Sequence, residues 1–597
     1  MPESAKESTS NDLPQPSLVI LFGSETGNAQ DVAECLWRDG RRRHFACRLL
    51  SMDDYNVADL PNEQLIVLVA STTGQGEEPS NMRSFWRFLL RRSLPLGSLA
   101  RVKMAVFGLG DSSYQKYNFA AKKLFRRLAQ LGASAVVPLG LADDQHDLGV
   151  DGAFQPWREQ LWSAVDALYP AGNTIISDDE LLPPKFKVEW IDALATLKAV
   201  QHSLPPCFVP VLENVRVTST DHFQDTRLIK FDISDFEEAM QYHPGDVLMV
   251  QPRNLMESVS LATEALGYDD SFLERRFTLT PTDPNILLPP KWLLSRSGAT
   301  VRQCFENYFD LQCVPRRSFF VLLAALSTDE LEKEKLQELC MAENQQDMYD
   351  YCNRPRRTVA ETLRDFEVTA RSIPFEYLFD LLSPIRPRAF SLASCPQTHQ
   401  GEVHILVAIV EYKTRLSIKR QGLCSTFLSR LNQGEKVWTW MRKGTFRWPE
   451  DPSSHVVLVG PGTGVAPFRS FAHFRHSSQA SGQVFLFFGC RYEEKDFYFK
   501  TEWMELPKLT LVTAFSREDP AEKVYVQHRI ENQGETIWRL ISEENGHLFV
   551  AGNADQMPKD VIQCLKNIAA KYGGVTDVDA FVEKLEKSGR LQFETWS

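Results

Sequence analysis

Short apolar runs alternate with helical patterns through residues 18–168, and this alternation constrains the fold more than any other feature. Four runs lack polar alternation, which is typical of buried parallel strands: LVILFG, QLIVLVAS, VKMAVFGLG and ASAVVPLG. The helical patterns between them carry Lys and Arg on their outer faces: NMRSFWRFLLRR and YNFAAKKLFRRLAQLG. Strands and helices that alternate at this spacing predict a doubly wound parallel sheet.

The rest of the chain predicts a barrel and a second parallel sheet. Short β-like segments in residues 206–255 and 385–449 suggest an antiparallel barrel, and the mostly helical stretch at about 256–375 is then an insertion into it. After residue 455 the alternation returns, with the runs HVVLVGPGTG, QVFLFFGC, LTLVTAF and HLFVAGN. The predicted fold class is therefore multidomain α/β plus β-barrel.

At 597 residues the chain is too long for one core, so we expect several domains. A polar tail occupies residues 1–16, and the first α/β domain occupies 17–168. Residues 169–204 are rich in Pro and acidic residues and are expected to form a hinge-like linker that contains a helix. The barrel domain is placed at 205–449, and the C-terminal α/β domain at 450–597.

Composition excludes several classes of function. The net charge of −12 argues against a nucleic-acid binder, which would present a basic face. The 11 cysteines include no Cys-x-x-Cys pair, so we expect neither a metal site nor a disulfide scaffold. This cysteine pattern also indicates a reducing compartment. The N-terminus has no apolar signal core, and no stretch reaches the roughly 18 apolar residues of a membrane span. We therefore expect a cytoplasmic protein without a membrane anchor.

The first predicted strand ends in a run of hydroxyls, glycine and amides from which a helix starts. Backbone N–H groups at a helix start bind phosphate well, and Gly27 permits close approach. The loop has no Lys, so it is not a P-loop. Taken alone, it is explained better as a capped turn, because Ser and Thr commonly cap helices. The candidate phosphate-binding residues are Ser24, Glu25, Thr26, Gly27, Asn28 and Ala29.

Two further glycine-bearing loops follow the next strands at the same edge of the sheet. Each could be an ordinary surface turn, but together with the ring of Tyr114 as a stacking face they favour an FMN site. The second loop contributes Ser71, Thr72, Thr73 and Gly74. The third loop contributes Leu109, Gly110, Asp111, Ser112, Ser113, Tyr114, Gln115, Lys116, Tyr117 and Asn118. Asp144 comes from a fourth loop, LADDQH.

On these motifs residues 18–165 resemble a flavodoxin, and the whole chain resembles the diflavin reductases related to cytochrome P450 reductase. The resemblance implies a flavodoxin-like FMN-binding domain at 17–168, an FAD-binding antiparallel barrel with its insertion, and a C-terminal NADP-binding sheet. The family often has Tyr where Thr73 stands. We therefore expect FMN binding that is weaker or more exposed on that side.

The segment RPRAFSLAS offers an Arg for a pyrophosphate and an aromatic ring for a flavin, although a strand with a surface Arg explains it equally well. GLCST resembles the family's second FAD loop, and the family usually has Tyr at the position of Phe390. The candidate FAD residues are Arg356, Arg388, Ala389, Phe390, Ser391, Gly422, Leu423, Cys424, Ser425 and Trp596.

VGPGTGVAPFRS follows a predicted strand and opens a helix, as a dinucleotide-binding turn does. Downstream hydroxyls and cations favour NADPH over NADH, because a site for NADH more often places an acid against the ribose. The alternative is a solvated charged loop, and the spacing from Arg517 to Lys523 is one residue longer than usual in the family. The candidate NADP residues are Thr463, Ser516, Arg517, Lys523, Val524, Tyr525, Val526, Gln527 and Asp560.

The resemblance also implies a hydride path. Trp596 stands where these reductases stack an aromatic ring over the FAD, which the nicotinamide must displace. The family clusters Ser, Cys and Asp beside this path; here Ser391 is kept, Glu594 replaces Asp, and Ala551 stands at the Cys position. The predicted catalytic residues are Ser391, Glu594 and Trp596, and we expect hydride transfer to be slower than in relatives that carry the thiol.

The family resemblance implies electron flow from NADPH to FAD, then to FMN, and then singly to an external acceptor, with the linker letting the FMN domain face each partner in turn. Likeness to soluble members implies an iron–sulfur protein acceptor, anamorsin, in cytosolic iron–sulfur cluster assembly. Two alternatives stay open: a soluble reductase for another haem or cobalamin protein, and a scaffold that keeps the folds without the cofactors.

Overall fold

The structure is a computed structural model, and it describes residues 15–74, 76–114, 116–170, 174–191, 207–341, 344–414, 418–519 and 521–596. Nearly all of the predicted tail, part of the predicted linker and Gln115, a candidate FMN residue, lie outside these ranges. None of the helices in the described part combines the length and the apolar character that crossing a bilayer requires.

The flavodoxin-like domain is built on a parallel sheet in the order β2-β1-β3-β4-β5, with β6 paired to β4. Helices α1 and α4 pack on one face, and α2 and α3 pack on the other. This is the doubly wound arrangement that the apolar runs predict. The elements are β1 (Ser17–Gly23), α1 (Asn28–Arg42), β2 (Ala46–Ser51), β3 (Leu65–Ser71), α2 (Arg83–Leu89), β4 (Lys103–Gly110), α3 (Phe119–Gln130), β5 (Ser134–Ala135), β6 (Gly140–Asp143) and α4 (Asp151–Leu168).

The barrel domain is one antiparallel sheet in the order β13-β10-β17-β8-β9-β14. A bridge between Leu392, just after β13, and Ile405 in β14 joins the two ends of this order, so the sheet closes. The predicted antiparallel barrel is confirmed. Its strands are β8 (Phe208–Arg216), β9 (Thr226–Asp232), β10 (Val247–Gln251), β13 (Arg388–Ser391), β14 (Glu402–Ala408) and β17 (Lys436–Arg442), and α14 (Leu423–Ser429) follows the short β16 (Arg420–Gln421).

The insertion between β10 and β13 is mostly helical, as the sequence predicts, and it also carries a small antiparallel sheet. In that sheet β7 (Phe186–Ile191) pairs with β11 (Arg276–Pro281) along its whole length. Residues 186–191 therefore form a strand within the predicted hinge-like linker. The main helices are α5 (Met256–Ala265), α7 (Val301–Asn307), α8 (Arg317–Leu326), α9 (Glu330–Cys340), α11 (Val359–Asp365), α12 (Glu367–Ser372) and α13 (Leu378–Leu381).

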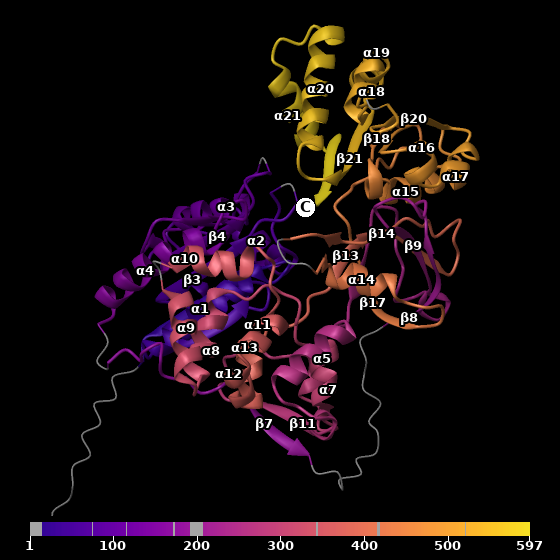
Figure 1. Ribbon diagram of the computed structural model, residues 1–597. Helices are drawn as coiled ribbons and strands as arrows, with labels where there is room; N and C mark the ends of the chain where they lie inside the picture. The colour runs from indigo at the N-terminus through magenta and orange to yellow at the C-terminus, as the bar shows by residue number, and fades with distance from the viewer. Residues whose placement is uncertain are drawn as a thin grey trace, which may run out of the picture.

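The C-terminal domain is a parallel sheet in the order β20-β19-β18-β21-β22. The last strand, coloured yellow, runs towards β13 of the barrel in Figure 1. The sheet and its main helices are β18 (Val456–Val459), α15 (Ala466–Ser477), β19 (Val484–Cys490), β20 (Leu509–Phe515), α18 (Val526–Asn532), β21 (His547–Asn553), α20 (Met557–Gly573), α21 (Val578–Lys587) and β22 (Leu591–Trp596).

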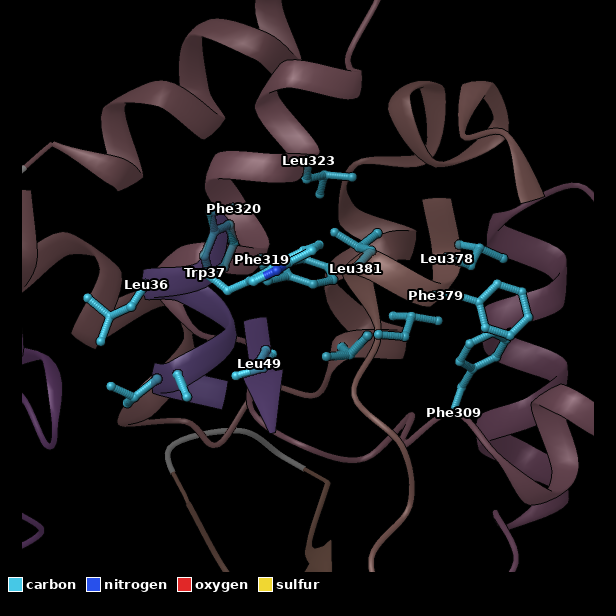
Figure 2. Close-up of a cluster of buried hydrophobic side chains, with 14 of the residues drawn as sticks. Leu36, Trp37, Leu49, Phe309, Phe319, Phe320, Leu323, Leu378, Phe379 and Leu381 are labelled. Atoms are coloured by element: carbon cyan, nitrogen blue, oxygen red, sulfur yellow. The ribbon is translucent and has the colours of Figure 1, made fainter. Parts of the chain in front are cut away.

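One buried apolar cluster spans the flavodoxin-like domain and the insertion. Leu36 and Trp37 of α1 share it with Phe319 and Phe320 of α8 and with Phe379 of α13, as Figure 2 shows. Trp37 is only 1% exposed. Burial of such side chains stabilises an interface by about 2 kcal/mol each. Any movement of the flavodoxin-like domain away from the insertion must therefore expose this surface.

Candidate functional site

The first candidate loop lies where β1 ends and α1 begins. Gly27 caps the helix with φ of +98°, a left-handed conformation that favours glycine, and its N–H donates to Ser24 Oγ at 3.0 Å. The helix starts at Asn28, so its first N–H groups have no partner within the helix. No side chain in the described part of the chain caps the helix, so the structure lacks the Ser or Thr cap of the alternative interpretation, and the first N–H groups are open to the phosphate of FMN.

The other two candidate loops meet at the same edge of the sheet. The N–H of Thr72 donates to Leu109 O at 2.9 Å, and the N–H of Asp144 donates to Gly110 O at 2.9 Å. A Cβ added at Gly110 would lie 2.8 Å from the backbone nitrogen of Asn118, so only glycine fits there. Parallel strands bring their carboxyl ends together. The structure thus gathers the candidate FMN residues that it describes around this edge.

An unpaired polar atom marks this edge. Asn118 is buried in a left-handed conformation, and its amide nitrogen donates to Ala142 O at 2.8 Å. Its Oδ1 accepts no hydrogen bond from the described residues. A buried acceptor without a partner is costly, and a ligand that donates a hydrogen bond would relieve the cost.

A cavity of about 740 Å³ lies between the flavodoxin-like domain and the rest of the chain. Thr26, Asn28 and Asp144 line it from the predicted FMN site, and Arg356 and Arg388 line it from the predicted FAD site. Burial raises the pKa of Asp144. The volume of the cavity is that of a site for a sizeable ligand. The structure therefore brings parts of the two predicted flavin sites to one cavity.

The second FAD loop starts α14, with Gly422 as its N-cap and Leu423, Cys424 and Ser425 in its buried first turn. Burial raises the pKa of Cys424 to about 12, so its thiol stays neutral at physiological pH. Ala389 and Phe390 belong to β13, which pairs with β10. Neutral helix-start amides beside the cation of Arg388 suit a pyrophosphate.

Arg420, just before this loop, is a residue that the sequence analysis missed. Its Nε donates to Pro355 O at 3.1 Å, and its Nη1 pairs with Glu361 at 2.8 Å. The side chain therefore ties the loop at Gly422 to the turn that carries Arg356. Its Nη2 is buried and has no partner among the described residues, so a donor stays available at this point. In the sequence, only the position of Arg420 next to GLCST could have indicated that it belongs to the site.

Two of the predicted catalytic residues are in direct contact. The Ser391 hydroxyl donates to Glu594 Oε1 at 2.7 Å, and the Thr445 hydroxyl donates to Glu594 Oε2 at 3.0 Å. Burial raises the pKa of Glu594 above that of an ordinary Glu. Ala551, at the family's Cys position, is the register partner of Glu594 on the neighbouring strand. Trp596 follows at the end of β22 and keeps 37% of its surface exposed.

The NADP candidates lie along the carboxyl edge of the C-terminal sheet. Thr463 sits in the turn after β18, and Ser516 and Arg517 follow β20. A Cβ at Gly464 would lie 2.2 Å from Ala551 O, which explains why this turn needs glycine. The candidates near the start of α18 are Lys523, Val524, Tyr525, Val526 and Gln527, and Asp560 lies in the first turn of α20.

One contact joins two of the segments that carry NADP candidates, α18 and α20. Gln527 donates to Asp560 Oδ2 at 3.0 Å, so the start of α18 is held against α20. The side chain of Tyr525 is exposed beside the cations of Arg517 and Lys523 in the sequence motif. Exposed hydroxyl and cationic groups at the edge of a sheet can bind a phosphate ester, such as the 2′-phosphate of NADPH.

Three arginines outside the flavodoxin-like domain were also missed as site residues. Arg316, Arg386 and Arg442 reach the first candidate loop or the first turns of α1. They lie 288 to 417 positions from their partners in the chain. No local pattern could reveal them, because only the packing of the domains brings them together.

Three family descriptions match the chain in order. They are flavodoxin over residues 20–157, FAD binding domain over 200–427, and oxidoreductase NAD-binding domain over 458–563. The chain is 45% identical to NADPH-dependent diflavin oxidoreductase 1 of Xenopus laevis, over 98% of this chain and 100% of that protein. The protein of that name from Bos taurus is also 45% identical, with the same coverage.

A more distant relative of the same name, from Schizosaccharomyces pombe, is 36% identical over 97% of this chain and 99% of its own length. The similarity therefore covers all three domains in animal and fungal relatives alike. With its flavodoxin, FAD-binding and NAD-binding domains, the chain belongs to the NADPH-dependent diflavin oxidoreductase 1 family.

Proposed function

We propose that this protein passes electrons from NADPH through FAD and FMN, and then singly, to an iron–sulfur protein acceptor, anamorsin, in cytosolic iron–sulfur cluster assembly. The family and its three domains make the chain an NADPH-dependent oxidoreductase with FMN and FAD as cofactors. The observation that best supports the electron route is the shared cavity, which residues from both predicted flavin sites line. The acceptor and the cytoplasmic location rest on the family resemblance.

Bound FAD supplies an acceptor for the hydride of NADPH, and bound FMN supplies release of single electrons. The chain's own residues orient and shield this chemistry. Ser391 and Thr445 each donate to one oxygen of Glu594, which holds the carboxyl group in place at the junction of β13 and β22. Because burial raises the pKa of Glu594, this group can hold a proton closer to neutral pH than an exposed Glu can.

The selectivity for NADPH is assigned to the loop after β20 and to the start of α18. The N–H of Ser516 donates to Cys490 O at 3.0 Å, and the N–H of Arg517 donates to Arg491 O at 2.9 Å. These backbone bonds hold the loop on the sheet. The Arg517 side chain donates from Nη1 to Ser516 O at 3.1 Å, and its other N–H groups can meet an anionic group. A guanidinium binds the 2′-phosphate of NADPH more strongly than it binds the free 2′-hydroxyl of NADH. Arg517 therefore favours NADPH over NADH.

The described part of the predicted linker is bound on both sides in this arrangement. The N–H of Ile176 donates to Arg42 O at 3.0 Å, and Lys185 pairs with Glu34 of α1. Strand β7 is in turn paired to β11 of the insertion. Delivery of electrons to a protein acceptor requires the FMN edge to be reached, so we propose that Lys185 and Glu34 separate when the domain opens.

The test is anaerobic transfer from NADPH to reconstituted anamorsin, followed by the optical spectrum of its iron–sulfur clusters. We expect reduction of the clusters that requires both NADPH and this protein. Reduction of ferricyanide without reduction of anamorsin would favour a haem or cobalamin protein as the acceptor. Reduction of neither would favour the scaffold alternative.

A further inference from the structure

Two arginines from outside the flavodoxin-like domain lie against the first turn of α1. Arg386 Nη2 donates to Gln30 Oε1 at 2.9 Å, and a Cβ added at Gly27 would lie 2.6 Å from Arg386 Nε. Arg316 Nη2 donates to Asn28 Oδ1 at 2.8 Å. The guanidinium groups therefore border the loop whose backbone N–H groups fit a phosphate.

These arginines belong to the insertion and to the segment that leads into the barrel. Arg316 is the N-cap of α8, and Arg386 lies between α13 and β13. Both line the cavity that Thr26 and Asn28 line from the opposite side. They stay beside the loop only while the flavodoxin-like domain is packed on the rest of the chain.

Arg386 has no directly bonded counter-ion in the described part of the chain, although its charge acts on the carboxyl of Asp31. Its hydrogen-bond partner is the neutral amide of Gln30, and no carboxylate of the described residues forms an ion pair with it. Arg316 forms an ion pair with Asp31 at 3.5 Å, and its charge also acts on the carboxyls of Asp144 and Asp151. Burial raises the pKa of all three carboxyls, which disfavours their charged forms. A partly buried cation without a counter-ion is costly, and an anion at the adjacent loop would offset the cost.

We propose that Arg386, supported by Arg316, stabilises the phosphate of bound FMN from outside the flavodoxin-like domain. The proposal rests on the FMN site described above. It makes FMN affinity depend on the closed arrangement of the domains. By linkage, the FMN phosphate then favours closure to the same extent, and loss of FMN favours opening.

The comparison of FMN with riboflavin isolates the phosphate. Riboflavin has the same ring and ribityl chain, so an arginine that acts on the phosphate changes only FMN binding. A charge-assisted contact contributes about 1.5 kcal/mol, which corresponds to roughly tenfold in affinity. We expect R386A to lower the ratio of FMN affinity to riboflavin affinity about tenfold, and R386K to keep most of the ratio.

The experiment uses the full chain with FAD retained and FMN removed, titrated with FMN or riboflavin and followed by flavin fluorescence. R302A is the matched control, since Arg302 belongs to the same insertion as Arg316 and its ion pairs, with Asp270 and Glu274, do not involve α1. We expect R302A to leave the ratio of affinities unchanged. Raised salt should lower the wild-type ratio and should have less effect on R386A.

An unchanged ratio in R386A and in R316A would overturn the proposal. If the wild-type chain binds neither flavin, the FMN site itself is wrong, which is a separate result. Retained FAD and an unchanged unfolding temperature show that a variant has folded. R316A provides an independent reading should R386A fail that check, and its ratio should fall in the same direction.

Discussion

The hydroxyl of Ser391 donates a hydrogen bond of 2.7 Å to Glu594 Oε1 and so joins the barrel to the last strand of the C-terminal sheet. The two residues lie 203 positions apart in the chain. Their contact places a hydroxyl and a buried carboxyl group together beside the exposed ring of Trp596. Two residues that the family resemblance assigns to the hydride path, Ser391 and Glu594, are thus in contact in the fold, and the path itself stays a prediction.

Removal of either partner should slow hydride transfer. We expect Ser391→Ala and Glu594→Gln each to lower the rate constant for flavin reduction by NADPH at least about tenfold. Because the two groups act through one hydrogen bond, the double variant should lose less than the product of the single losses. Anaerobic stopped-flow absorbance measures the rates, and Ser453→Ala, an exposed serine, is the control. Fully multiplicative losses would show that the residues act separately.

FMN binding should require the absence of a side chain at Gly27, and not only its left-handed backbone conformation. A Cβ at Gly27 adds a close contact with Arg386, whereas Gly97, with φ of +80°, has no atom within 4 Å of its added Cβ. Both Ala substitutions pay about 1 kcal/mol of backbone strain. We expect Gly27→Ala to lose most of its FMN on purification and Gly97→Ala to keep it. Equal FMN content in the two variants would contradict this account.

Arg517 should select NADPH over NADH. Arg517→Ala removes a charge-assisted bond to the 2′-phosphate. It should raise the KM for NADPH about 10- to 100-fold and leave the KM for NADH nearly unchanged. Steady-state reduction of ferricyanide with each nucleotide gives both values. Arg539→Ala is a suitable control, because Arg539 is about half exposed, pairs with Glu544, and lies just before β21, at the opposite end of that strand from the carboxyl edge. A parallel rise in both KM values would argue for a structural role.

The contact between the barrel and the C-terminal domain should weaken in mild acid. Arg469 of α15, 3% exposed, donates to His404 Nδ1 at 3.2 Å and approaches His399. Burial, aided by Arg469, lowers the pKa of His404 to about 2 and that of His399 to about 4. Between pH 6.5 and about 4 the unfolded chain therefore binds more protons than the folded chain, so stability falls as the pH falls.

Thermal unfolding of the holoprotein from pH 7 to pH 5 tests this expectation. Glu502, whose pKa lies at about 2, begins to lose its own stabilising effect only below about pH 4.5, so the histidines dominate the window. We expect His404→Gln to flatten the decline in unfolding temperature. His243→Gln, which replaces a side chain that is 76% exposed, should not. Identical profiles for the wild type and His404→Gln would refute the assignment.

The sequence predicts well what depends on local pattern. The apolar runs around Leu68 and Val106 become central strands, and the glycine loops lie at one edge of their sheet, because strand direction and hydrophobic burial leave little choice. It misses what depends on packing between domains. Nothing near Phe186 indicates that it pairs with Pro281, and nothing near Arg386 indicates that it meets Gly27.

The most direct test of the central claim is an anaerobic titration of the purified protein with NADPH, followed by flavin absorbance. Two flavins that each take up two electrons require about two equivalents of NADPH per chain for full bleaching. We predict that endpoint, together with equal amounts of FMN and FAD released on denaturation. An endpoint near one equivalent, or a single kind of flavin in a fully loaded preparation, would contradict the account.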